Sequence, residues 1–255
     1  MVTLNIKKRE DTRPPVPNDG VHYPESDGEP VAESDFQYVP LTYATSALSA
    51  HFSEEPDIYV TGDMLIYFVE GDPRRSVAPD VFLIPNLDKR FRTSYFMWLE
   101  GQVPSFIMEV TSNSTWREDI GRKRDLYESW GVSEYWLYDP TEETRLTTLL
   151  QGFRLVDDAY EPIEIEFDGE SYRGFSSALG LELHARKDWF SFFNPATGEY
   201  LKNLEESERA RVSERRAREN EQTARLTAER ERDEERARRE DLERVLREHG
   251  IEPPS

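Results

Sequence analysis

The fold is decided by residues 104–138, which read PSFIMEVTSNSTWREDIGRKRDLYESWGVSEYWLY. Two apolar runs, 104–111 and 134–138, flank a segment in which large side chains recur at helical spacing. The apolar runs predict buried strands, and the period of about 3.6 residues predicts a helix over 115–130. Gly131 follows that helix, where a left-handed residue commonly ends one. The stretch therefore predicts a strand, a helix and a second, parallel strand joined by a right-handed crossover.

Apolar runs on both sides of this unit predict further strands. Residues 57–69 and 78–84 precede it, and shorter runs follow it at 144–150, 153–156 and 163–167. The later runs are expected to continue the sheet as antiparallel strands. The predicted fold class is α/β, a mixed β-sheet flanked by helices, with a further helix near 41–52.

The composition divides the chain into three parts. Residues 1–37 are acidic and rich in proline without a hydrophobic period, which is typical of a flexible arm. Residues 38–198 contain the apolar runs and are predicted to form the folded domain. Residues 199–255 are mostly Glu, Arg and Ala, with Glu four residues before Arg in many places, and predict a long charged helix. Its alanines keep a seven-residue period only briefly, so a coiled coil is left open.

Charge and cysteine content exclude some classes of protein. The 255 residues include no cysteine, which excludes disulfides, thiolate zinc sites and cysteine nucleophiles. Residues 199–255 hold 14 Lys and Arg against 17 Asp and Glu, which leaves 18 against 35 in the rest. Such an acidic domain disfavours non-specific coating of nucleic acid. No apolar run is long enough to span a membrane, so a cytoplasmic protein without a membrane partner is expected.

Two acidic residues interrupt the predicted strands. Asp80 follows Pro79, and Glu109 lies in the middle of the run 104–111. Burying a carboxylate is costly unless it is paired or binds a metal ion. Magnesium prefers oxygen ligands, commonly one or two carboxylates with water and phosphate. Asp80 and Glu109 are therefore candidate ligands for Mg²⁺, with Mn²⁺ as a substitute.

A lysine lies in the apolar stripe of the predicted helix. The stripe follows spacings of four and three residues and comprises Trp116, Ile120, Lys123, Tyr127 and Trp130. A lysine that faces the sheet needs an anionic partner, and the acids of the strands are the nearest candidates. Beside a metal-bound water, Lys123 could orient that water or help to deprotonate it.

Together these motifs resemble a known family. The segments 78–80, 107–112, 119–127 and 131–136 are similar to the Uma two family of restriction endonucleases, within the PD-(D/E)xK nuclease superfamily, over roughly residues 38–185. The resemblance implies a restriction-endonuclease-like fold and Mg²⁺-dependent hydrolysis of DNA. It implies that Asp80 and Glu109 bind the metal, with the backbone carbonyl of Val110 as a third ligand.

The sequence departs from the family pattern at one position. Thr111 stands where the superfamily has a lysine, two residues after the glutamate, and the resemblance implies that Lys123 takes over that role from the helix. Asp63, which follows Gly62, is a weaker candidate for an additional acid.

Each of these assignments has a structural alternative. Asp80 and Glu109 could be charges at strand ends that pair with arginines. Lys123 could bridge to Asp119 on a solvated edge, and Asp63 could be a turn residue. Basic residues near the candidate site, which could contact phosphate or merely form surface salt bridges, are Arg74, Arg75, Arg117, Arg122 and Arg124.

Two functions are consistent with these observations. The first is a Mg²⁺-dependent DNA endonuclease whose catalytic residues are Asp80, Glu109 and Lys123. The second is a nuclease-fold module without activity that uses its C-terminal helix for assembly. In either case, self-association through a sheet edge or that helix is a further prediction.

Overall fold

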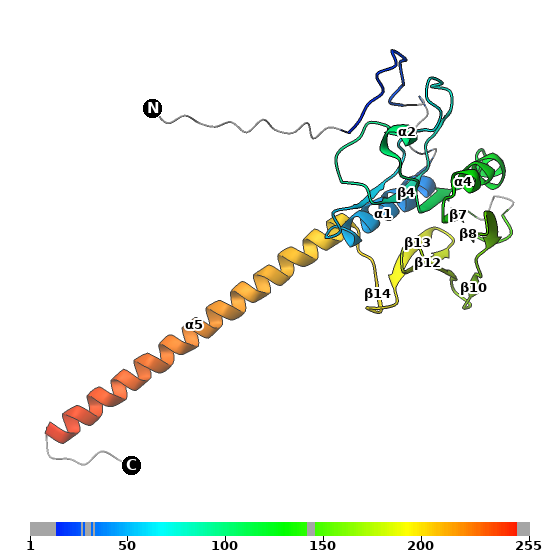
Figure 1. Ribbon diagram of the computed structural model, residues 1–255. Helices are drawn as coiled ribbons and strands as arrows, with labels where there is room; N and C mark the ends of the chain where they lie inside the picture. Colours follow the sequence, from blue (N-terminus) through cyan, green and yellow to red (C-terminus); the bar gives the residue numbers. More distant parts are fainter. Residues whose placement is uncertain (1–13, 27, 29–31, 33, 142–145, 249–255) are drawn as a thin grey trace, which may run out of the picture. The chain divides into compact units, whose positions relative to one another are not determined.

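The computed structural model describes residues 14–26, 28, 32, 34–141 and 146–248 (Figure 1). The chain separates into two compact units, one up to Leu204 and one from Glu205 onward. Among the described residues, the strands lie in the first unit and a long helix forms the second. Each unit is described by itself.

The centre of the first unit is a six-stranded mixed sheet in the order β1-β4-β6-β7-β8-β9. Strands β6 and β7 are parallel, and every other neighbouring pair is antiparallel. The strands are β1 (Ile58–Thr61), β4 (Val81–Pro85), β6 (Phe106–Val110), β7 (Glu134–Tyr138), β8 (Leu150–Val156) and β9 (Ala159–Pro162). The predicted mixed sheet with a parallel strand–helix–strand unit at its centre is confirmed.

The crossover between β6 and β7 is helical but not regular. It consists of α3 (Trp116–Glu118), a π-helical turn η1 (Asp119–Lys123) and α4 (Arg124–Trp130). Gly131 ends α4 with φ of 80°, as the sequence predicted. A π turn holds one residue more than an α turn, so it shifts the side chains that follow relative to those before it.

This shift divides the predicted apolar stripe. Tyr127 is fully buried, and Lys123 and Trp130 are partly buried. However, Ile120 is 37% exposed, whereas Asp119 is buried in its place. The expectation that Ile120 faces the core is therefore wrong, because uniform α-helical spacing does not hold across η1.

Two smaller sheets adjoin the central one. One has the order β10-β11-β12-β13-β14 and the other the order β3-β2-β5. Their strands are β10 (Glu166–Phe167), β11 (Tyr172–Ser176), β12 (Leu181–Arg186), β13 (Trp189–Asn194), β14 (Glu199–Tyr200), β2 (Ile66–Tyr67), β3 (Ser76–Val77) and β5 (Tyr95–Phe96), and a short helix α2 (Met97–Glu100) follows β5.

Three strand predictions differ from this arrangement. The run 57–69 is divided between β1 and β2, which belong to different sheets. The run 163–167 does not continue the central sheet, because β10 pairs with β11 instead. The run 144–150 contributes only its last residue to a strand, and its residues 144 and 145 lie outside the described residues.

The central sheet has an apolar cluster on each face. Met108 and Trp136 belong to the cluster that contains α1 (Asp35–His51), and Ile107 and Tyr135 belong to the cluster that contains Tyr127 of α4. Successive strand residues point to opposite faces. By this alternation, Asp80 and Glu109 are directed toward the face covered by the crossover helices.

The boundaries of the folded unit extend beyond 38–198. Helix α1 begins at Asp35, and β14 pairs with β13 through residues 199 and 200. Within the predicted arm, the ring of Tyr23 packs edge-on against Tyr67 and Phe96, with centroid distances of 5.0 and 5.3 Å. An aromatic side chain of the arm thus packs against a third apolar cluster, which contains Leu65, Tyr67 and Phe96.

The second unit contains α5 (Leu204–Glu248), a helix of 45 residues. Arg and Glu four residues apart form ion pairs along it, for example Arg218 with Glu214 at 2.6 Å. Each such exposed pair stabilises a helix by only about 0.2–0.5 kcal/mol. Within the described residues, no helix has the length and apolar character required to cross a membrane.

Candidate active site

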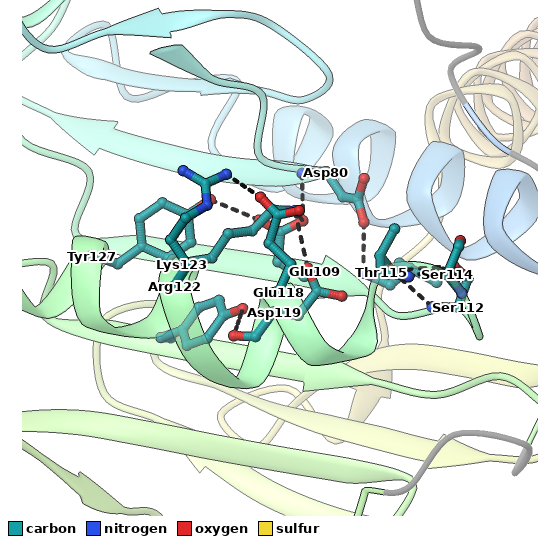
Figure 2. A network of polar contacts seen from close by, with 12 residues as sticks. Asp80, Glu109, Ser112, Ser114, Thr115, Glu118, Asp119, Arg122, Lys123 and Tyr127 are labelled. Atoms are coloured by element: carbon teal, nitrogen blue, oxygen red, sulfur yellow. Dashed lines mark hydrogen bonds and ion pairs between the residues drawn. The ribbon is translucent and has the colours of Figure 1, made fainter. Parts of the chain in front are cut away.

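Strands β4 and β6 bring the two predicted acids together. The strands are antiparallel, and Val81 is opposite Met108. The backbone N–H of Asp80 donates to Glu109 Oε2 at 3.4 Å, and the N–H of Val110 donates to Asp80 Oδ2 at 2.7 Å. Glu109 is 1% exposed. Residues 29 positions apart in the sequence therefore form one carboxylate pair, shown in Figure 2.

The crossover helix supplies a cation to this pair. Lys123 Nζ lies 3.0 Å from Glu109 Oε2 and 3.0 Å from Asp119 Oδ1. The side chain of Lys123 is 14% exposed and that of Asp119 is 1% exposed. Lys123 does bridge to Asp119, as one alternative had it, but within a buried site rather than on a solvated edge (Figure 2).

Two tyrosines complete the buried network. The hydroxyl of Tyr127 donates to Glu109 Oε1 at 2.7 Å, and the hydroxyl of Tyr135 donates to the backbone carbonyl of Asp119 at 3.0 Å. Tyr127 belongs to the predicted apolar stripe of the helix. It is fully buried, but its hydroxyl also fixes the second oxygen of Glu109.

Burial and charge shift the pKa values of these groups. Burial, reinforced by repulsion from Glu109, raises the pKa of Asp80 well above its usual range, against the effect of Lys123. Burial raises the pKa of Asp119 to about 6, although Lys123 opposes the shift. Burial lowers the pKa of Lys123, but attraction to Glu109, Asp119 and Asp80 outweighs it and leaves the pKa above its usual value. Lys123 is therefore a charged donor.

The donor atoms at this point fit a hard divalent cation. Asp80 Oδ1 accepts no hydrogen bond from any described residue, so one carboxylate oxygen is available. The carbonyl of Val110 accepts a hydrogen bond from Gln37 Nε2 at 3.3 Å and keeps a second lone pair. Within the described ranges, no cluster of three or more His, Cys, Asp or Glu side chains has a metal-binding arrangement. The candidate ligand set is thus two carboxylates and one carbonyl, which suits Mg²⁺ with water completing its shell.

Asp63 has a different place from the other candidates. Its side chain is exposed, its φ is 49°, and its N–H donates to the carbonyl of Pro79 at 2.9 Å. A left-handed aspartate of this kind is typical of a turn. The contact is nevertheless relevant, because it holds the backbone immediately before Asp80.

Gly62 explains why that backbone can approach so closely. A Cβ atom at residue 62 would lie 2.0 Å from the carbonyl oxygen of Asp80. The segment 61–63 therefore packs directly on the residue that carries the candidate ligand, and only glycine fits there.

Gly62→Ala is expected to destabilise the protein by about 1–3 kcal/mol, because the added methyl must displace the backbone of Asp80. Urea denaturation of both proteins measures this loss. Gly121→Ala is the control, since a Cβ atom there meets nothing within 4 Å. Equal stability of Gly62→Ala and the wild type would contradict the predicted close packing.

Thr111 lies where the family pattern has a lysine. It is 1% exposed, and its Oγ1 accepts and donates no hydrogen bond among the described residues. By alternation along the strand it is directed to the same side as Glu109. The amine of Lys123 reaches Glu109 from the helix instead, so the structure contains a carboxylate–lysine pair despite the threonine.

The site contains residues that sequence reasoning underrated. Asp119 was considered only as a partner for Lys123, and Gly62 only as the residue before a turn. Regular helical spacing directs Ile120 inward, whereas the π turn η1 turns Asp119 inward instead. The alternative in which Asp80 and Glu109 pair with arginines is not what the structure shows, because Glu109 contacts Lys123 and Tyr127.

Comparison with known proteins gives a family match. The model of the Uma2 family, described as "Putative restriction endonuclease", matches residues 12–186. No curated protein matches the chain. A solved structure from Anabaena variabilis ATCC 29413, described as a "putative nuclease belonging to DUF820", has 14% identity and a TM-score of 0.41. The similarity covers 58% of this chain and 75% of that one.

Proposed function

Because this chain belongs to the Uma2 family, whose model matches residues 12–186, we propose that it is a Mg²⁺-dependent DNA endonuclease. The predicted family and the restriction-endonuclease-like fold class are confirmed by that match. The observation that supports catalysis is the contact of Lys123 Nζ with Glu109 Oε2 at 3.0 Å, beside Asp80. Metal dependence, the DNA substrate and the roles of individual residues are parts of this proposal.

In the proposed site, Asp80, Glu109 and the carbonyl of Val110 would hold the metal ion. When bound, the ion would polarise the phosphate and lower the pKa of a water molecule. Tyr127 fixes one oxygen of Glu109 and so orients the carboxylate. Lys123, whose pKa is raised by the surrounding carboxylates, keeps its proton and would place a positive charge beside the phosphate oxygens on which negative charge develops. Removal of a proton by Lys123 is less consistent with this environment.

Asp119 would act through Lys123. It binds the same ammonium group as Glu109, from the helix side. With two anionic partners, the side chain of Lys123 is held in one position, and this reduces the reorganisation needed during reaction.

The test is titration of Mg²⁺ and Mn²⁺ into wild-type protein and Glu109→Ala by calorimetry, with cleavage of single- and double-stranded DNA followed in parallel. Loss of an outer-shell partner commonly reduces metal affinity by about 10–100-fold, so loss of a ligand is expected to reduce it by more than about 100-fold. Cleavage should be lost with it.

Glu161→Ala is the control, because this carboxylate is exposed on β9 and should leave both metal binding and cleavage unchanged. The proposal fails if wild-type protein binds neither metal ion, or if Glu109→Ala binds and cleaves as the wild type does. The predicted self-association remains a prediction.

A further inference from the structure

The start of the crossover helix presents a tryptophan and an arginine as a stacked pair. The guanidinium carbon of Arg117 lies 4.6 Å from the ring centroid of Trp116. Arg117 is exposed, Trp116 is only partly buried, and α3 contains no buried residue. The indole of Trp116, just before the π turn that brings Asp119 inward, is therefore not part of the core. We refer to these two residues as the Trp116–Arg117 pair.

The charge of Arg117 is not neutralised by a carboxylate within the described part of the chain. By contrast, Arg122 on the same helical segment pairs with Glu118, and Arg74 pairs with Asp72 at 2.9 Å. In residues 1–198, which hold 18 basic and 35 acidic residues, an arginine without a carboxylate partner is a candidate for phosphate binding. Arg117 provides such a cation.

The pair lies close to the candidate active site. Trp116 and Asp119 are three residues apart, so they lie on neighbouring parts of one helical face. Lys123 is the last residue of η1, which follows α3 directly. The preceding residue segment, 112–115, joins the pair directly to β6 and Glu109, and the N–H of Trp116 donates to the carbonyl of Ser112 at 3.1 Å.

We infer that the Trp116–Arg117 pair binds an unpaired nucleotide of the substrate, next to the scissile phosphate. The guanidinium of Arg117 leaves the indole of Trp116 to bind the adjacent phosphate, and the base stacks on the ring face that it vacates. Aromatic rings bind single strands in this way because every base has an exposed face, whereas bases within a duplex are stacked on one another. The partner is therefore a single-stranded or locally unpaired nucleic acid. This inference deepens the proposed function and rests on it.

The test measures binding without cleavage. Full-length wild type, Trp116→Ala, Trp116→Phe and Arg117→Gln are titrated in EDTA into a fluorescein-labelled single-stranded oligonucleotide, an abasic strand with the same phosphates, and a duplex, by anisotropy. Arg122→Gln is the matched control, because it removes a guanidinium from the same segment that Glu118 already neutralises. Thermal denaturation confirms that each variant is folded.

Trp116→Ala is expected to weaken binding of the single strand by about tenfold and to have little effect on the abasic strand, whereas Trp116→Phe retains most of the affinity. Arg117→Gln should reduce the slope of log K against log salt concentration by about 0.7, the value for one phosphate contact on a single strand. Arg122→Gln should leave the slope unchanged.

The inference is overturned if Trp116→Ala and Arg117→Gln bind as the wild type does, if Trp116→Ala loses equal affinity for the abasic strand, or if the wild type binds no single strand. A protein partner at this surface would give the first or third result. These measurements need no metal, so they are independent of cleavage. Strand binding by the Trp116–Arg117 pair can be absent from a protein that cleaves DNA, and it can be present in a protein that does not.

Discussion

Lys123→Met is expected to lower the free energy of unfolding by about 5 kcal/mol at pH 8 and to abolish cleavage. The substitution leaves Glu109 and Asp119, each 1% exposed, without the ammonium group that lies 3.0 Å from both. Breaking a buried ion pair from one side costs about 3–5 kcal/mol, because the remaining charge stays buried. Two carboxylates are left here, so the loss is at the upper end unless they bind protons.

Proton binding gives the effect a pH dependence. The pKa of Asp119 is already raised to about 6 from 3.8 by burial, and loss of Lys123 raises it further. A carboxyl group whose native pKa exceeds its unfolded pKa binds more protons in the native state. Its contribution to stability is complete below about pH 4 and is lost as the pH rises through the native pKa. The deficit of Lys123→Met should therefore be smaller at pH 5 than at pH 8.

Urea denaturation at the two pH values measures this difference. Lys123→Arg keeps the charge and should lose less stability, although its fork geometry differs from that of an ammonium group. Lys187→Met removes an exposed lysine and should be close to neutral. A deficit in Lys123→Met that is the same at both pH values would show that charge burial is not its cause.

Glu134→Ala is expected to destabilise the protein by at least about 3 kcal/mol without any direct effect on metal binding. Glu134 is 1% exposed on β7, and it accepts hydrogen bonds from Arg154 Nη2 at 2.9 Å, Ser176 Oγ at 2.5 Å and Trp136 Nε1 at 3.1 Å. These groups come from two sheets, so the carboxylate joins the central sheet to β11. Removing it leaves the buried hydroxyl of Ser176 and the buried indole N–H of Trp136 without an acceptor, each at a cost of about 1–3 kcal/mol.

Denaturation by urea, with calorimetric metal titration of the folded variant, tests this prediction. Glu134→Gln keeps one acceptor oxygen and should lose less stability than Glu134→Ala. Glu161→Ala provides the exposed control. A loss below about 1 kcal/mol in Glu134→Ala, or a loss of metal affinity at full stability, would mean that Glu134 does not join the two sheets.

The two buried glutamates show how far the sequence can be interpreted. Glu109 lies in the middle of one apolar run and Glu134 at the start of another, and both carboxylates are buried. Their partners differ, because Lys123 and Tyr127 surround Glu109, whereas the groups around Glu134 come from residues 154 and 176. Such long-range contacts depend on how the sheets pack, which local periodicity does not report.

The fold was predictable where local signals agree with tertiary packing. The run 104–138 combines apolar strands, helical spacing and a terminating glycine, and it forms the predicted parallel unit. The placement of β10 was not predictable, because a strand of two residues carries no information about which sheet it joins. The inward position of Asp119 was missed because spacing rules assume about 3.6 residues per turn throughout.

The π-helical turn at Asp119–Lys123 also determines how this site can vary in evolution. The amine reaches Glu109 through the register of a helix rather than that of a strand, so position 111 is free to carry a threonine. The same arrangement makes the segment sensitive to length. Deleting one residue within it would restore regular α-helical spacing and turn the side chains on one side by about 100° relative to those on the other. Homologous chains that share this site should therefore accept substitutions at position 111 more readily than gaps between 119 and 123.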